Sequence, residues 1–122
     1  MDTHSKTTQL IAQLARDTLA GKVDWKIKSA PTGLLEGTAN IVPIFLGTDY
    51  KTNKIGVFQF RYKSFYDEDA YHWSEDIGFC IYDISGTILL EFHEYSPVLL
   101  NLFELARNNA ADINGLLDNL LD

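Results

Sequence analysis

Acidic and aromatic side chains are concentrated in one short segment, residues 65–76. Five carboxylates and four aromatic rings occur in these twelve residues, without a Lys or an Arg. Aromatic side chains supply rigid contact area and carboxylates supply electrostatic steering, a combination that favours binding to a basic protein surface. The candidate partner-binding residues are Tyr66, Asp67, Glu68, Asp69, Tyr71, Trp73, Glu75 and Asp76.

Catalysis by these carboxylates is the weaker interpretation. General acid–base work requires at least one desolvated carboxyl group, whereas Asp67, Glu68 and Asp69 are consecutive at a predicted turn, where water reaches all three. A solvated hairpin tip without any binding role remains an alternative. We expect the rings to divide, with Phe65 and Trp73 turned inward and Tyr66 and Tyr71 outward.

Two histidines raise a second chemical possibility, a metal site. His72 and His93 fall on consecutive predicted strands, and Glu75, Asp76, Glu91 and Glu94 are near them in sequence. If those strands pair, His93 comes to lie opposite Glu75 or Ile77, and imidazoles with carboxylates can bind zinc. The alternative is a set of solvent-facing side chains, so we assign no metal ligand, cofactor or catalytic residue.

Cys80 is the only cysteine, which excludes an intrachain disulfide and a cysteine zinc cage. It lies between Phe79 and Ile81 in a predicted strand, where a small buried hydrophobic residue is the common reading. A nucleophile paired with His72 or His93 is the alternative. The chain contains none of the glycine-rich phosphate-binding motifs or the nucleophile elbow.

The net charge of −7 is unevenly distributed along the 122 residues. Residues 1–66 carry nine basic and five acidic side chains, whereas residues 67–94 carry eight acidic side chains and no Lys or Arg. Nucleic acid is a poor partner for this chain because phosphate binding needs clustered Lys and Arg. No apolar run approaches a membrane span, and we expect neither a membrane partner nor a signal peptide.

The elements that must position these residues follow from hydrophobic periodicity. Residues 5–20 show an apolar stripe at helical spacing, with Ser5 or Thr7 as N-cap and Gly21 as a left-handed C-cap. Residues 22–28 alternate polar and apolar and predict a short strand or extended arm, in which Trp25 is a core residue rather than an interface anchor. Residues 29–33 predict a loop.

Four strand patterns follow, at about 38–50, 55–65, 71–84 and 87–94. Pro43 makes the first an edge or bulged strand, because proline lacks the ladder donor. In the second, we expect the face with Phe58 and Phe60 to meet the core and the face with Ile55 and Val57 to meet solvent. Residues 83–86 predict a tight turn. The pattern is that of an antiparallel meander with one buried face.

Two helices complete the chain. Ser96 and Pro97 predict the N-terminus of the first, which extends to about Asn108. The second, about Ala111 to Leu121, is expected to bury Ile113, Leu116, Leu117, Leu120 and Leu121. We therefore predict a single α+β domain over residues 1–122: an N-terminal helix, an antiparallel β-meander of about four to five strands, and two C-terminal helices packed on one sheet face.

The order of elements resembles that of small bacterial α+β proteins of uncharacterised function. The opening Thr18-Leu19-Ala20-Gly21-Lys22-Val23-Asp24-Trp25 and the helix Leu99–Ala106 carry this resemblance. The layout is also similar to that of immunity proteins of bacterial toxin systems. It implies a cytoplasmic, non-enzymatic protein that binds another protein, as a monomer or homodimer, and it transfers no catalytic residue. The alternatives are a small metal-dependent enzyme using His72 and His93, and a structural homodimer pairing through the Pro43 edge or the last helix.

Overall fold

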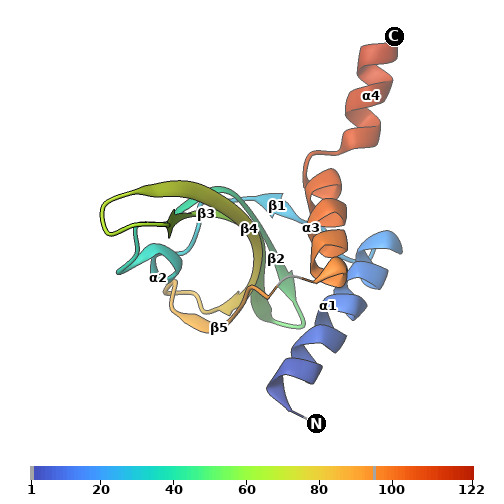
Figure 1. Cartoon of the computed structure of the whole chain (residues 1–122). Coiled ribbons are helices and arrows are strands. Elements are labelled where there is room, and N and C mark those ends of the chain that lie inside the picture. Colours follow the sequence, from blue (N-terminus) through green and yellow to red (C-terminus); the bar gives the residue numbers. More distant parts are fainter. Residues whose placement is uncertain (1, 95) are drawn as a thin grey trace.

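The computed structural model describes residues 2–94 and 96–122 and confirms the predicted α+β fold (Figure 1). An N-terminal helix precedes a five-stranded antiparallel sheet, and two helices follow it. The strands are neighbours in chain order, and short turns join the last four. The helices are α1 (Thr3–Leu19), α2 (Thr32–Leu35), α3 (Pro97–Ala110) and α4 (Ile113–Leu121); the strands are β1 (Lys26–Ile27), β2 (Ile41–Tyr50), β3 (Asn53–Phe65), β4 (Tyr71–Tyr82) and β5 (Ile88–Phe92).

Local sequence signals set the ends of the long helices. The N-cap of α1 is Asp2, whose side chain accepts a hydrogen bond from the Ser5 amide at 2.7 Å, so the prediction of Ser5 or Thr7 as the cap was wrong. Gly21 follows α1 at φ +74°, as predicted. Ser96 caps α3 and Pro97 occupies its first turn, also as predicted.

The main hydrophobic core lies between the sheet and the helices α1 and α3. These helices pack against the outer face of a strongly curved sheet, which we call the helix face (Figure 1). Trp25 is buried there, as predicted, and its indole N–H donates to the Thr18 hydroxyl at 3.0 Å. The helix-face core comprises Ile11, Leu14, Ala15, Val23, Trp25, Leu46, Ile55, Val57, Phe79, Leu99, Leu102, Phe103 and Ala106.

The opposite face of the sheet, which we call the hollow face, has a second core. Phe45, Phe58 and Cys80 are buried there under Leu34 of α2, a short helix that begins inside the predicted loop of residues 29–33 and extends beyond it. The expectation that Ile55 and Val57 face solvent was therefore wrong, because both sheet faces are covered over residues 55–58, in the first half of β3. A strand buried on both sides loses the clean alternation that one solvated face produces.

Glycines allow the sheet to curve around the hollow. Gly56 and Gly78 lie on the hollow face beneath the rings of Phe45 and Phe58. A Cβ atom at Gly56 would lie only 2.2 Å from the Phe45 ring, and one at Gly78 only 2.3 Å from the Phe58 ring. Placing an aromatic ring over a neighbouring glycine is a device by which curved sheets fill their concave side.

The pairing of β2 with β3 is irregular near Pro43. The register shifts between Ile41 and Ile44, which places a bulge at Pro43. Of the two predicted alternatives, an edge strand or a bulged strand, the structure shows the bulge. On its other side, β2 pairs with β1 only through Leu46 and Gly47.

The last helix differs from its prediction. Figure 1 shows α4 continuing beyond the end of α3 and away from the sheet. It has no buried residue, and Leu116, Leu117, Leu120 and Leu121 are 49–84% exposed, so the expectation that this stripe is buried was wrong. No helix in the described parts of the chain has the length and apolar character needed to cross a bilayer.

Candidate functional site

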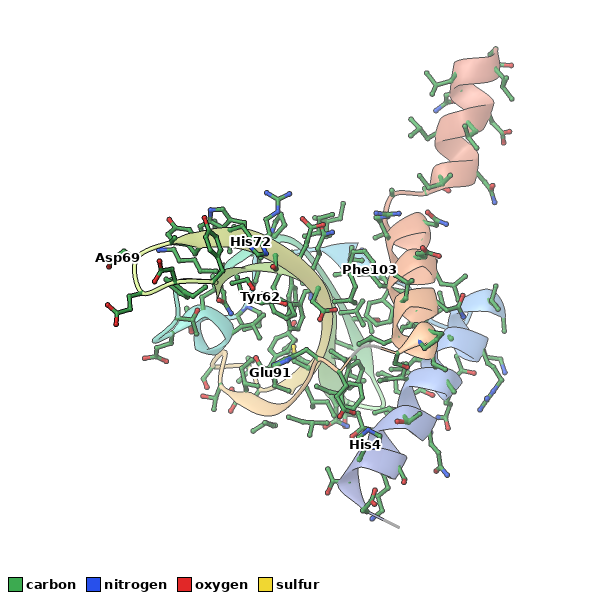
Figure 2. All side chains as sticks on the ribbon, viewed as in Figure 1. His4, Tyr62, Asp69, His72, Glu91 and Phe103 are labelled. Carbon is green, nitrogen blue, oxygen red and sulfur yellow. The ribbon has the colours of Figure 1, made fainter. Side chains whose placement is uncertain are left out.

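The acidic segment, residues 65–76, forms the tip of the long β3–β4 hairpin and the first half of β4. Phe65 pairs with Tyr71, and the amides of Tyr66 and Asp67 both donate to the Ala70 carbonyl across the turn. Asp67, Glu68 and Asp69 are all exposed, and Asp69 lies at the far end of the hairpin (Figure 2). Water reaches these carboxylates, which suits them to electrostatic steering rather than to general acid–base chemistry.

Strand alternation divides the candidate residues between two faces. Tyr71, Trp73 and Glu75 continue the helix face of β4, which buries Phe79 farther along the strand. Tyr66 and Asp76 belong to the hollow side, where the Tyr66 ring stacks on His72 at a centroid distance of 6.0 Å. The eight residues therefore do not form one surface. The tip carboxylates border both faces of the hairpin, whereas Tyr71 and Trp73 lie on one face and Tyr66 lies on the other.

An exposed aromatic cluster occupies the helix face of the hairpin. Phe65, Tyr71 and Trp73 are 62%, 41% and 45% exposed, so the expectation that Phe65 and Trp73 turn inward was wrong. Tyr71 lies 5.4 Å from Phe65 and 6.0 Å from Trp73 between ring centroids, and the Lys63 ammonium lies 4.7 Å from the centre of the Tyr71 ring. These rings are exposed because α1 and α3 cover only the other end of the strands (Figure 1).

Sequence reasoning missed Phe65 and Lys63 as members of this cluster. Their signal was available in the alternation of β3, since both lie on the same strand face as Ile55 and Val57. That face was expected to meet solvent, and Phe65 at its end was expected to turn inward.

Charge on the helix face is partly neutralised within the hairpin. Glu75 accepts hydrogen bonds from Arg61 at 2.8 Å and from Gln59 at 2.7 Å. Glu75 is thus an internally paired residue, while the tip carboxylates lack a cationic partner among the described residues.

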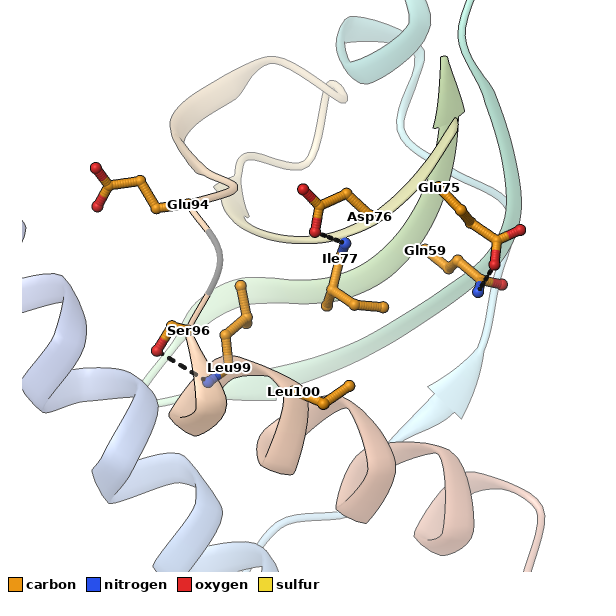
Figure 3. Close-up of a pocket in the computed structure, with 8 residues that line it drawn as sticks. All are labelled: Gln59, Glu75, Asp76, Ile77, Glu94, Ser96, Leu99 and Leu100. Carbon is orange, nitrogen blue, oxygen red and sulfur yellow. Dashed lines mark hydrogen bonds between the residues drawn. The ribbon is translucent and has the colours of Figure 1, made fainter. Parts of the chain in front are cut away.

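A groove of about 270 Å³ separates the hairpin from the start of α3 (Figure 3). Ile77, Leu99 and Leu100 form its apolar part. Glu75, Asp76 and Glu94 line it with carboxylates, and Asp76 also accepts a hydrogen bond from the Ile77 amide at 2.8 Å. The carboxylate of Glu75 is bonded to Arg61 and Gln59 and that of Glu94 to His4, so Asp76 is the carboxylate of the groove without a cationic partner among the described residues.

The two histidines of the metal hypothesis lie in different places. β5 pairs with β4 so that Glu91 lies opposite Cys80 and Phe92 lies opposite Phe79. This register places β5 nearer the β4–β5 turn than the predicted pairing of His93 with Glu75 or Ile77. His72 lies on the hairpin arm (Figure 2), whereas His93 directly follows β5 and its Nε2 lies 3.1 Å from the carboxylate of Glu91, two residues before it. Within residues 2–94 and 96–122, no group of three or more His, Cys, Asp or Glu side chains is placed to hold a metal ion.

Cys80 is buried beneath α2, in the environment predicted for a small hydrophobic residue. Burial, with a smaller contribution from the negative charge of Glu91, raises the pKa of its thiol to about 12. The thiol therefore stays protonated at neutral pH, which is unfavourable for a nucleophile.

Comparisons of the chain with protein-family models, with curated proteins and with solved structures find no match. The resemblance of its layout to immunity proteins consequently stays a prediction.

Proposed function

We propose that this protein is a non-enzymatic protein-binding module, of an immunity or regulatory type, that docks its β3–β4 hairpin on a basic surface of another protein. The observation that carries the proposal is the exposed aromatic cluster of Phe65, Tyr71 and Trp73, adjacent to the acidic tip. Large exposed apolar side chains rimmed by charge are typical of interaction sites.

The aromatic cluster, the tip carboxylates and the adjacent groove would each contribute differently to recognition of the partner. The aromatic cluster provides rigid contact area, the class of side chain in which binding energy concentrates. The carboxylates Asp67, Glu68 and Asp69 provide long-range attraction that accelerates association with a basic partner. The groove beside Asp76 supplies a recess for one Lys or Arg side chain of that partner.

The first experiment identifies the partner from the hairpin itself. A photo-crosslinking residue replaces Tyr66 at the tip, and the protein is exposed to an extract of the cells that express it naturally. The matched control carries the same crosslinker at Ile84, which is 92% exposed on the β4–β5 turn. We expect a protein of basic surface charge that is captured from position 66 and not from position 84.

The second experiment measures the affinity of the captured protein for three chains. The first is the wild type, the second carries Asp67→Lys, Glu68→Lys and Asp69→Lys, and the third carries Asp24→Lys, Glu36→Lys and Glu104→Lys, three exposed carboxylates outside the hairpin and α4. Both triple variants change the net charge by the same amount, so a general charge effect is controlled. We expect the hairpin variant to weaken binding by at least about tenfold and the other variant to stay within about twofold. Equal effects of the two variants would remove the hairpin from the interface.

A further inference from the structure

The strand β4 has an open edge along the half that reaches the hairpin tip. β3 pairs with β4 from end to end, whereas β5 pairs with it only from Phe79 onward. In the described parts of the chain, no strand lies beside residues 71–76 on the side of β5. We call this side of residues 71–76 the β4 edge. None of its residues is buried, so another molecule can reach it.

The hydrogen-bonding groups of the β4 edge belong to alternate residues. The amide of Tyr66 donates to the Ala70 carbonyl at 3.1 Å, so residue 70 directs its backbone groups toward β3. Because an antiparallel ladder alternates, residues 71, 73 and 75 direct their amides and carbonyls away from β3. The amide of Ile77, the next in this series, donates to the side chain of Asp76 at 2.8 Å, as expected of an amide outside the β3–β4 ladder (Figure 3). The edge therefore presents the row of groups with which another strand pairs.

The groove of about 270 Å³ beside α3 lies along this edge. Residues 75–77 line it on the β4 side, and Leu99 and Leu100 line it on the side of α3 (Figure 3). If β5 continued past Phe92 in its register, Ser96 would lie opposite Glu75, but Ser96 caps α3 instead. The groove thus occupies the position of the strand that this chain does not supply.

The side chains beside the edge indicate which kind of segment fits there. On the helix face, Tyr71 and Trp73 are exposed and Ile77 and Leu100 line the groove, which suits apolar side chains. On the hollow side, Asp76 lacks a cationic partner among the described residues, which suits a Lys or an Arg. Successive side chains of a strand point to opposite faces, so a fitting segment alternates apolar and basic residues.

A second copy of the chain fits this edge less well. Residues 67–94 carry eight acidic side chains and no Lys or Arg, so two paired β4 edges would bring carboxylates together. Like charges on neighbouring strands destabilise their pairing. Charge complementarity therefore favours a basic segment of another protein.

We infer that the β4 edge binds an extended segment of the partner protein by strand addition. The backbone of that segment pairs with residues 71, 73 and 75, and one of its basic side chains lies beside Asp76 in the groove. In complexes of this kind, main-chain hydrogen bonds supply affinity and the flanking side chains supply specificity. The inference rests on the proposed function and adds the form of the partner at the interface, which is a strand of alternating apolar and basic residues.

A synthetic peptide tests the edge without the natural partner. The probe is blocked at both ends and alternates arginine and valine over about seven residues, an ordinary strand length. One control peptide has proline in place of valine, and a second has glutamate in place of arginine. We expect the probe to slow amide hydrogen exchange at residues 71, 73 and 75 by at least about tenfold, and neither control peptide to do so.

Two substitutions at one position separate backbone pairing from side-chain contacts. Glu75→Ala removes the carboxylate that pairs with Arg61, and Glu75→Pro removes both this carboxylate and the outward amide. An edge strand tolerates proline where the missing N–H would face solvent, and urea unfolding checks that both variants fold. We expect Glu75→Pro to bind the probe at least about fivefold more weakly than Glu75→Ala. Tyr71→Pro compared with Tyr71→Ala replaces this pair if Glu75→Pro does not fold.

Each outcome decides the inference. Exchange that slows only at the tip amides, or at none of the edge amides, would overturn strand addition, as would equal affinities of the proline and alanine variants. Equal binding of the glutamate peptide would overturn the basic character of the segment. A chain that dimerises in sedimentation equilibrium, with the edge amides protected without any peptide, would replace the partner by a second copy.

Failure of the proposed function gives a different result. It appears as the absence of a basic protein captured from position 66. A captured protein that binds Glu75→Pro and Glu75→Ala equally well would leave the proposed function standing and remove strand addition alone.

Discussion

Cys80 shows how one side chain can be assigned a role from its neighbours in sequence. Apolar residues flank it in a predicted strand, and the structure places it in the hollow-face core. The sequence alone does not show that Glu91 lies opposite Cys80 on β5, where its negative charge adds to the rise of the thiol pKa. Cross-strand neighbours of this kind depend on register, and the predicted register of β5 was displaced.

The raised pKa of Cys80 predicts a loss of stability at alkaline pH. The unfolded chain loses this proton near the ordinary value of 9.0, and the native chain keeps it to about 12. Between these values the unfolded state binds fewer protons, so the free energy of unfolding falls as pH rises. By pH 10 we expect the wild type to lose about 1.4 kcal/mol more than Cys80→Ala.

Urea titrations of both proteins between pH 7 and 10.5 measure this difference. The smaller side chain of Cys80→Ala adds a cost that does not vary with pH, and Tyr82, whose pKa burial also raises, is present in both proteins. Parallel pH profiles of the two proteins would contradict the prediction.

The close packing of the Phe58 ring over Gly78 predicts that the sheet does not tolerate a larger side chain at position 78. In Gly78→Ala, the new Cβ would meet the Phe58 ring at 2.3 Å, so the ring or the strand must move. We expect the free energy of unfolding to fall by about 1–3 kcal/mol, the usual cost of overpacking a core. Chemical denaturation measures this change.

Ser74→Ala provides the matched comparison, since Ser74 lies on the same strand and the same face, beyond the second core. We expect a change below about 0.5 kcal/mol there. A Gly78→Ala protein as stable as Ser74→Ala would mean that the Phe58 ring adapts at little cost and that the glycine has no role in the curvature.

At the scale of elements, periodicity predicted most of the architecture. Alternation identified the long strands, and capping residues located α3 and the end of α1. The predictions that were wrong share one cause. A periodic apolar stripe indicates that a face tends to be buried, but it does not show which element covers that face. Ile55 and Val57 lie under helices, α2 covers the hollow, and the stripe of α4 has no cover within the described chain.

The candidate site was less predictable than the fold. Composition located the hairpin tip and its charge, because local sequence determines both. The division of Tyr66 from Tyr71 and Trp73, and the internal pairing of Glu75 with Arg61, required the register of β3 with β4. Binding surfaces combine several strands, so a linear segment indicates their position but not their composition.

The bulge at Pro43 has a consequence for how this protein behaves when it is crowded. β1 and the following Lys28 pair with β2 only from Phe45 to Gly47, so the part of β2 near Ile41 lies beyond this pairing. Pro43 cannot donate a backbone hydrogen bond, and the bulge interrupts the regular spacing of the remaining donors there. Intermolecular strand addition, the first step of many aggregation processes, is therefore disfavoured at this edge.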